Sequence, residues 1–117
     1  VVESGATTHT NHYLDPELAA LYNAKVGPSS AARLARINEL LAQAPRPFSV
    51  AEFAGISRDR HDGEDNSLWR SGKSKTLASW IMESHARGAP KLRVLIANPD
   101  EPETLQEFVL DDAFWKR

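Results

Sequence analysis

The chain has 117 residues, no cysteine and a formal net charge of -2, from 14 lysines and arginines against 16 aspartates and glutamates. This length fits one domain or part of one, and the scattered basic residues exclude a nucleic-acid backbone as the main partner. Without cysteine, the chain has no disulfide, no zinc thiolate site and no thiol nucleophile of its own.

The N-terminal region carries the polar sequence Thr-His-Thr-Asn-His at positions 8–12. We expect a short strand over residues 6–13. Strand side chains alternate between two faces, which gives one set of Thr8, Thr10 and His12 and a second set of His9, Asn11 and Tyr13. The two histidines therefore point apart, which favours surface or hydrogen-bonded histidines over a His-x-x-His metal site.

Two helices are predicted next. Asp15-Pro16-Glu17 is typical of a helix start, and Gly27-Pro28 is expected to close this first helix. A second helix is predicted over residues 31–44, with Ser29 or Ser30 as its cap. Its apolar residues recur at spacings of three and four and predict a packed face opposite a solvated one: Leu34, Ile37 and Leu41 against Arg33, Arg36 and Glu39.

A third helix near residues 50–57 has two local signals. Ser49 and Glu52 match a capping box, and Phe48 and Phe53 match a hydrophobic staple. The polar stretch 58–74 is predicted to be a loop. It places His61 beside several acidic residues but lacks the calcium-loop pattern, so a solvated acidic loop is favoured over a divalent-cation site.

Three strands are predicted over residues 76–82, 91–96 and 106–110. Helices followed by three antiparallel strands predict an α+β fold. Trp80 and Ile81 would point to opposite faces of this sheet. The sheet is therefore expected to be apolar on both sides and to need a covering layer on each.

Asn11 is the strongest candidate for chemistry. Acyl transfer from an amide passes through a tetrahedral oxyanion, and a carboxamide held on a rigid strand is a hydrogen-bond donor that stabilises this charge. The alternative is that Asn11 only ends a strand before a turn.

The order of several short sequences resembles one family. They are Thr-Asn-His at 10–12, a capped helical stretch, Ser67-Leu68-Trp69-Arg70, the runs 76–82 and 97–100, and finally 107–110. In this order they are similar to the C-terminal part of the acyl-coenzyme A:isopenicillin N (6-aminopenicillanic acid) acyltransferase family of N-terminal-nucleophile hydrolases. The resemblance implies that residues 1–117 form one segment of a four-layer αββα sandwich, with strands and part of a helical layer.

The resemblance also implies roles for individual residues. Asn11 would form part of the oxyanion hole, and Arg70 would orient carboxylate groups of the site or the substrate. Ser67 would line the same pocket. Lys73 or Lys75 would stand for a substrate-binding basic residue of some members, at a different local spacing. Neither a metal nor a cofactor is expected.

In this family a precursor cleaves itself before a cysteine, whose thiol attacks the acyl donor and whose freed α-amino group is the general base. Because the chain has no cysteine and begins with Val1, we expect the nucleophile in an upstream segment or subunit. The isolated chain would then be an inactive C-terminal fragment. The whole protein would be an amidohydrolase or acyltransferase that acts on a linear amide, a β-lactam side-chain amide or an acyl-coenzyme A through an acyl-enzyme.

Two alternatives stay open. One is a non-catalytic protein- or ligand-binding α+β module that uses the acidic loop 59–66 and an exposed Trp69. The other is a stand-alone domain that forms a homodimer over its open sheet face. Since no apolar run reaches the roughly 18 residues that span a bilayer, we expect no membrane partner and a soluble protein. The C-terminus is no peroxisomal Ser-Lys-Leu address, and the cytoplasm is the favoured compartment.

Overall fold

The computed structural model describes residues 5–22, 25–44 and 46–116, which form an α+β fold with a three-stranded antiparallel sheet. This confirms the fold class and the antiparallel strands predicted from the sequence. Val1, on which the expectation of an upstream nucleophile rests, lies outside the described residues. The elements follow in the order α1 (Pro16–Tyr22), α2 (Pro28–Gln43), α3 (Val50–Ser57), α4 (Gly63–Asn66), β1 (Ala78–Glu83), β2 (Lys91–Ile96), β3 (Thr104–Val109) and α5 (Asp112–Trp115).

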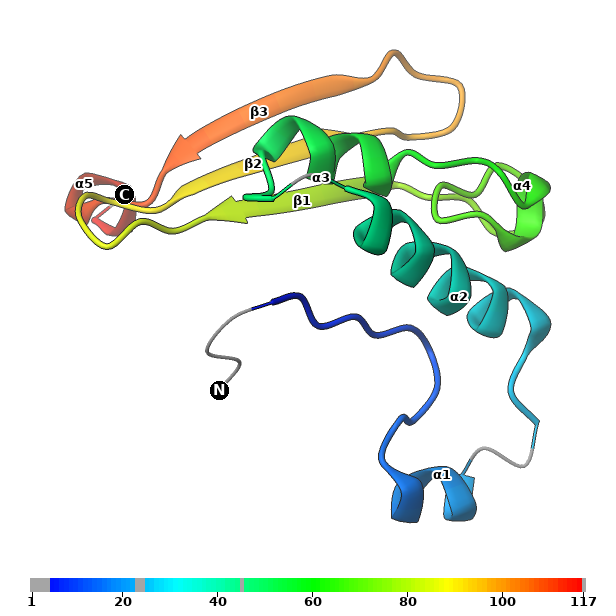
Figure 1. The fold of residues 1–117 in the computed structure, drawn as a ribbon. Coiled ribbons are helices and arrows are strands. Elements are labelled where there is room, and N and C mark those ends of the chain that lie inside the picture. The colour runs from blue at the N-terminus through cyan, green and yellow to red at the C-terminus, as the bar shows by residue number, and fades with distance from the viewer. Residues whose placement is uncertain (1–4, 23–24, 45, 117) are drawn as a thin grey trace.

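Figure 1 shows the three strands side by side in chain order, with α3 across one face of the sheet. α2 leads away from the sheet, α1 lies beyond the N-terminal end of α2, and the extended N-terminal segment runs back along α2. Across the described ranges, every helix is too short or too polar to span a lipid bilayer. α1 and most of α2 thus project from the sheet, and α3 connects them to it.

The two faces of the sheet have different surroundings. Ser79 and Ile81 of β1 face α3, where the Ser79 hydroxyl donates a hydrogen bond to Ser57 Oγ at 3.1 Å. Trp80 and Met82 alternate with them and point to the other face, where they are 69% and 61% exposed. Trp80 and Ile81 thus lie on opposite faces, as predicted. α3 covers the face of Ile81, and α5 contacts the other face at Phe108, whose ring lies 5.9 Å from that of Phe114.

The face that carries Ile81 also holds a row of charges. Arg93 of β2 pairs with a carboxylate on each neighbouring strand, through Nη1 to Glu83 at 2.9 Å and through Nε to Glu107 at 2.6 Å. The hydrogen bond with Glu83 is the largest cause of a raised pKa at Arg93, and the same bond lowers the pKa of Glu83. One guanidinium group therefore links all three strands.

The N-terminus of α3 carries the capping box and the staple that the sequence predicts. Ser49 Oγ accepts a hydrogen bond from the Glu52 N–H at 3.2 Å, and the Glu52 carboxylate accepts one from the Ser49 N–H. The Phe48 and Phe53 rings lie 5.3 Å apart, centroid to centroid, and complete the staple. The capping box and the staple are both confirmed, and the helix has the predicted bounds.

The start of α2 differs from the prediction. Its N-cap is Gly27 without a side-chain hydrogen bond, and Pro28 takes the first helical turn, where a missing N–H is tolerated. Gly27-Pro28 thus opens α2 and does not close α1. Neither Ser29 nor Ser30 caps the helix, because both hydroxyl groups are bonded to other parts of the chain.

Two further expectations need correction. Residues 6–13 form no strand, and they pair with no strand in the described part of the chain. Hydrogen bonds from their side chains hold them against α2 instead. The polar stretch 58–74 contains the short helix α4. The predicted bounds of β1 and β3 differ from the observed ones by up to two residues, and β2 has the predicted bounds.

Candidate functional site

The Thr-Asn-His sequence is attached to the N-terminal half of α2. Thr10 Oγ1 donates a hydrogen bond to the Ser30 carbonyl at 3.0 Å, and His12 Nδ1 lies 2.8 Å from Ser30 Oγ. Ser30 is buried. Further back, Thr8 Oγ1 donates to Asn38 Oδ1 at 2.6 Å. Alternate residues of the segment therefore face α2, which is the predicted period of two, although the segment is not part of a sheet.

Asn11 lies between these anchors and is exposed. Its Oδ1 accepts a hydrogen bond from Arg33 Nη2 at 2.7 Å. Arginine has only donors, so the atom that faces it must be the carboxamide oxygen. The Nδ2 group of Asn11 makes no hydrogen bond to any residue that the structure describes, so its two N–H donors are available to an incoming oxygen atom.

Arg33 places a positive charge beside this amide, and Arg70 acts on it in turn. The Nε of Arg33 donates to the Ser29 carbonyl at 3.2 Å, one turn back along α2. Partial burial lowers the pKa of Arg33, and the positive charge of Arg70 lowers this pKa further. The Arg33 guanidinium is therefore in contact with the Asn11 carboxamide, and the charge of Arg70 also acts on Arg33, a combination suited to an oxyanion or a carboxylate.

The loop between α4 and β1 carries Arg70. The Ser29 hydroxyl donates to the Asp65 carbonyl at 2.7 Å and attaches α4, which leads into this loop, to α2. Arg70 itself is fixed through its backbone, because its N–H donates to Thr76 Oγ1 at 2.9 Å and its carbonyl accepts from the Thr76 N–H at 3.0 Å. The closed loop therefore fixes the backbone from which the Arg70 side chain extends.

A glycine makes this loop possible. A Cβ atom at Gly72 would overlap the carboxylate of Asp65, so a larger residue here would displace that side chain. The same carboxylate accepts a hydrogen bond from the Lys73 N–H at 2.8 Å. The Lys73 and Lys75 side chains are exposed beside this turn, and their predicted role in substrate binding stays a prediction.

Ser67 has a different environment from Asn11 and Arg70. It is 0% exposed, and its hydroxyl donates to the Gly63 carbonyl at 2.6 Å. In this conformation the hydroxyl group stabilises α4 and does not line an open pocket. The structure therefore leaves Asn11 exposed and bonded to Arg33, whereas Ser67 is buried and bonded to α4.

Trp69 is buried, with 4% of its surface exposed, which corrects the expectation of an exposed tryptophan. Its backbone N–H donates to the Asp59 carbonyl at 2.9 Å. The guanidinium groups of Arg58 and Arg60 lie 5.3 and 5.9 Å from its ring. Trp69 is thus the packing anchor of the loop and offers no surface to a partner.

An ion pair joins α2 to the connection between α3 and α4. Arg36 donates to both carboxylate oxygens of Asp59, at 2.8 and 3.2 Å, and to Glu39 at 2.9 Å. The side chains of Arg36 and Asp59 are mostly shielded from solvent. The hydrogen bonds from Arg36 are the largest cause of a lowered pKa at Asp59. This pair holds Asp59, and with it Trp69, against α2.

The lowered pKa of Asp59 gives a pH-dependent stability. Because the folded-state pKa lies below the unfolded value of about 3.9, the pair stabilises the fold above that value and loses its effect as the pH falls through the folded-state pKa. Asp59→Asn is expected to lower the thermal midpoint at pH 7 and to flatten its acid decline. Thermal unfolding between pH 7 and 2.5 measures both, with the exposed Asp112→Asn as control. An equally steep acid decline in Asp59→Asn would contradict the assignment.

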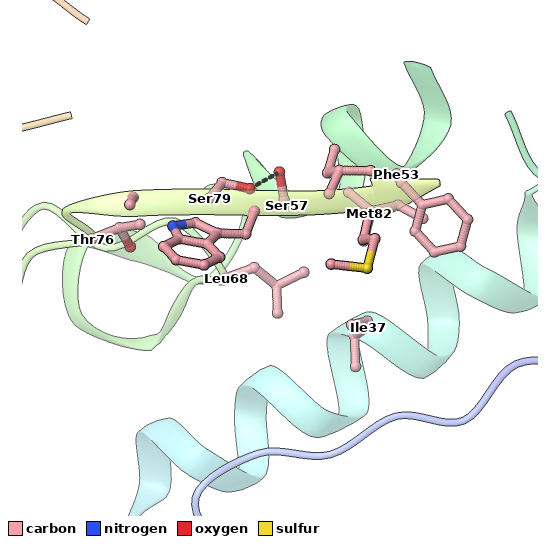
Figure 2. Close-up of a pocket in the computed structure, with 11 residues that line it drawn as sticks. Ile37, Phe53, Ser57, Leu68, Thr76, Ser79 and Met82 are labelled. Carbon is pink, nitrogen blue, oxygen red and sulfur yellow. Dashed lines mark hydrogen bonds between the residues drawn. The ribbon is translucent and has the colours of Figure 1, made fainter. Parts of the chain in front are cut away.

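An apolar pocket of about 430 Å³ lies along the free edge of β1, between this strand, α2 and α3. Figure 2 shows Ile37, Phe53, Leu68 and Met82 around it, with the Ser79 to Ser57 hydrogen bond at its wall. No charged residue lines the pocket, and none of Asn11, Arg33 and Arg70 does. It therefore suits an apolar group or packed side chains and is separate from the polar cluster.

Arg33 was missed in the sequence because a charged residue opposite the apolar positions of a helix is usually solvated. One signal was present. Ser30 and Arg33 are three residues apart, which places a hydroxyl and a guanidinium on one side of a helix. This Ser-x-x-Arg pair, and not only Ser67 and Arg70, therefore matches the motif, and hydrogen bonds join it to the Thr-Asn-His sequence.

Comparison with known proteins agrees with the family inferred from the motifs. The sequence model of the family described as acyl-coenzyme A:6-aminopenicillanic acid acyl-transferase matches residues 2–100. This range includes the Thr-Asn-His sequence, the loop that carries Arg70, and strands β1 and β2. No curated protein matches the chain. Since the family match covers most of the chain, the predicted family is confirmed, and the chain belongs to the acyl-coenzyme A:6-aminopenicillanic acid acyl-transferase family.

Proposed function

We propose that the chain forms part of an autoprocessed N-terminal-nucleophile amidohydrolase or acyltransferase that acts on a linear amide or a β-lactam side-chain amide through an acyl-enzyme. The observation that carries the proposal is the Asn11 carboxamide, whose oxygen is bound by Arg33 and whose N–H donors are left available. Membership of an acyltransferase family supports this chemistry.

Each residue of the cluster has a separate task. The nucleophile attacks the carbonyl carbon of the substrate, the carbonyl oxygen becomes an oxyanion, and Asn11 Nδ2 donates a hydrogen bond to it. The C–N bond then breaks, and the amine leaves with a proton. Arg70 orients a carboxylate of the substrate or of the site. Ser67 contributes through the loop, since its hydroxyl is bonded to Gly63.

The nucleophile lies outside these residues in this proposal. The chain has no cysteine, so a segment or subunit beyond residues 1–117 supplies the thiol and the freed α-amino group that acts as general base. We call the protein that combines both segments the parent protein. In its four-layer αββα sandwich, the apolar sheet face with Trp80 and Met82 packs against a second sheet, and α3 belongs to a helical layer.

The binding-module alternative has less support. It relied on an exposed Trp69 as its central contact, and Trp69 is buried. The acidic residues near it are partly engaged within the chain, as the Arg36 pair with Asp59 illustrates. The polar cluster around Asn11 has no comparable explanation as a packing element, because Asn11 is exposed.

Acyl labelling tests the proposal. The parent protein is incubated with an acyl-coenzyme A donor, quenched in acid, digested and mapped by mass spectrometry. We expect the acyl group on a residue outside 1–117, and we expect the isolated chain to take up no acyl group and to release no amine. An acyl group on a residue of this chain, or a parent protein that forms no acyl-enzyme with thioester or amide donors, would contradict the proposal.

A further inference from the structure

The Asn11 carboxamide has two ends of nearly equal shape and opposite hydrogen-bonding character. A rotation of 180° about its terminal bond exchanges the oxygen, which accepts, for the NH₂ group, which donates. An exposed asparagine without a partner populates both orientations. Only the orientation with NH₂ toward the substrate stabilises an oxyanion, so any group that selects this orientation raises the fraction of productive enzyme.

Arg33 is placed to make this selection. Its Nη2 lies 2.7 Å from Asn11 Oδ1. With the amide rotated, the NH₂ group would face a guanidinium that has no acceptor, and two sets of donors would meet. The wrong orientation thus loses a charge-assisted hydrogen bond and gains a repulsive contact.

The remaining contacts of Arg33 agree with this role. Arg36, Arg58 and Arg93 each contact a carboxylate. Among the residues that the structure describes, Arg33 contacts none. Its Nε is bound to the Ser29 carbonyl, which fixes the direction of the guanidinium plane, and its Nη2 meets a neutral amide. A structural arginine on this helix would pair with an acid, as Arg36 does one turn later.

The backbone of Asn11 is held independently of Arg33. Thr10 and His12, on either side, are both bonded to Ser30. Ser30 and Arg33 lie one turn apart on α2. The helix therefore fixes the position of the backbone through Ser30 and the orientation of the amide through Arg33.

We infer that Arg33 is a positioning residue that holds the Asn11 carboxamide with its NH₂ group directed at the oxyanion. The inference rests on the proposed function, because the orientation matters only if Asn11 is a donor in catalysis. Arg33 acts through Asn11 and needs no contact with substrate.

A double-mutant cycle in the parent protein tests the inference, with kcat and KM measured for each variant. Arg33→Met keeps an unbranched apolar stem of similar length to the aliphatic part of arginine and removes the guanidinium donors. It is expected to lower kcat about 10- to 100-fold, the range of a lost charge-assisted hydrogen bond, with KM nearly unchanged. Arg33→Lys retains one cationic donor and is expected to recover a large part of this loss. Since Arg33 acts through Asn11, Asn11→Ala/Arg33→Met should be no slower than Asn11→Ala.

Arg36→Met is the matched control on the same helix. It removes an arginine that pairs with Asp59 and does not contact Asn11, so it should lower the thermal midpoint with little change in kcat. Thermal unfolding of all variants separates folding from catalysis. If Arg33→Met fails to fold, Arg33→Ala, which also removes the donors and keeps a strong helix former at this position, replaces it in the same cycle.

The outcomes distinguish the inference from the proposed function. Additive effects of Asn11 and Arg33, or a raised KM with unchanged kcat, would overturn the positioning role. So would an Arg33→Met variant with normal kcat in an enzyme that Asn11→Ala inactivates. A normal rate in Asn11→Ala would instead overturn the oxyanion role of Asn11, and the inference with it.

Discussion

Asn11→Ala in the parent protein is expected to lower kcat about 10²- to 10³-fold, the usual effect of removing one oxyanion donor. The substitution removes the N–H donors and leaves the anchors at Thr10 and His12 in place. KM should change little, because the charge on the oxygen develops only in the transition state. Steady-state kinetics with an amide or thioester substrate measure both constants.

Two further variants sharpen this experiment. Asn11→Asp has the same shape but donates no hydrogen bond when ionised, so it should be as slow as Asn11→Ala. Asn38→Ala is the matched control, because Asn38 is also an exposed asparagine bonded to the N-terminal segment, through Thr8. It should retain most of the rate. An Asn11→Ala enzyme with the rate of the unmodified parent protein would refute the role.

Trp69→Ala is expected to have the largest effect on stability, about 3–5 kcal/mol of unfolding free energy. Trp69 is 4% exposed, and its removal would leave a cavity beneath the loop that carries Arg70. Arg58 and Arg60 would also lose the ring that they flank. Urea unfolding of the parent protein measures the change in free energy from the shift of the midpoint.

The controls for Trp69 use the same residue type and a smaller ring. Trp115 is 70% exposed in α5, so Trp115→Ala should cost less than about 1 kcal/mol. Trp69→Phe keeps an aromatic ring and should lie between the two. If Trp69→Ala and Trp115→Ala have equal unfolding free energies, the loop does not depend on Trp69.

The sequence predicted those elements whose signals are local. α3 has the predicted bounds because the capping box and the staple are complete within a few residues. β2 does also, as an apolar run bounded by turns. For both, tertiary contacts agree with local preference.

The parts that were missed depend on partners distant in sequence. A strand requires a second strand, and residues 6–13 are bonded to a helix instead. Ser30 is a good helix cap by type, but the buried contacts with Thr10 and His12 engage its hydroxyl group. Trp69 follows a polar stretch, and such a position predicts an exposed side chain. In the structure Trp69 is buried, with Arg58 and Arg60 beside its ring and its backbone N–H bonded to the Asp59 carbonyl.

The candidate site was predicted in part. The composition of the Thr-Asn-His sequence indicated Asn11, and the family resemblance indicated Arg70. Asn11 is bonded to Arg33 near the start of α2, and the charge of Arg70 acts on the same guanidinium group. Arg33 was not predicted, because the helical pattern distinguishes an apolar face from a charged one but does not show which charged residue meets another segment.

The guanidinium that joins the three strands also limits how they align. A slip of β2 by one residue would turn Arg93 away from Glu83 and Glu107 and direct it to the face of Trp80. The slip would also leave the Glu83 and Glu107 carboxylates without the cation that they share. A foreign copy of β2 that pairs out of step would lose the same two ion pairs, so Arg93 favours the aligned sheet over mispaired ones.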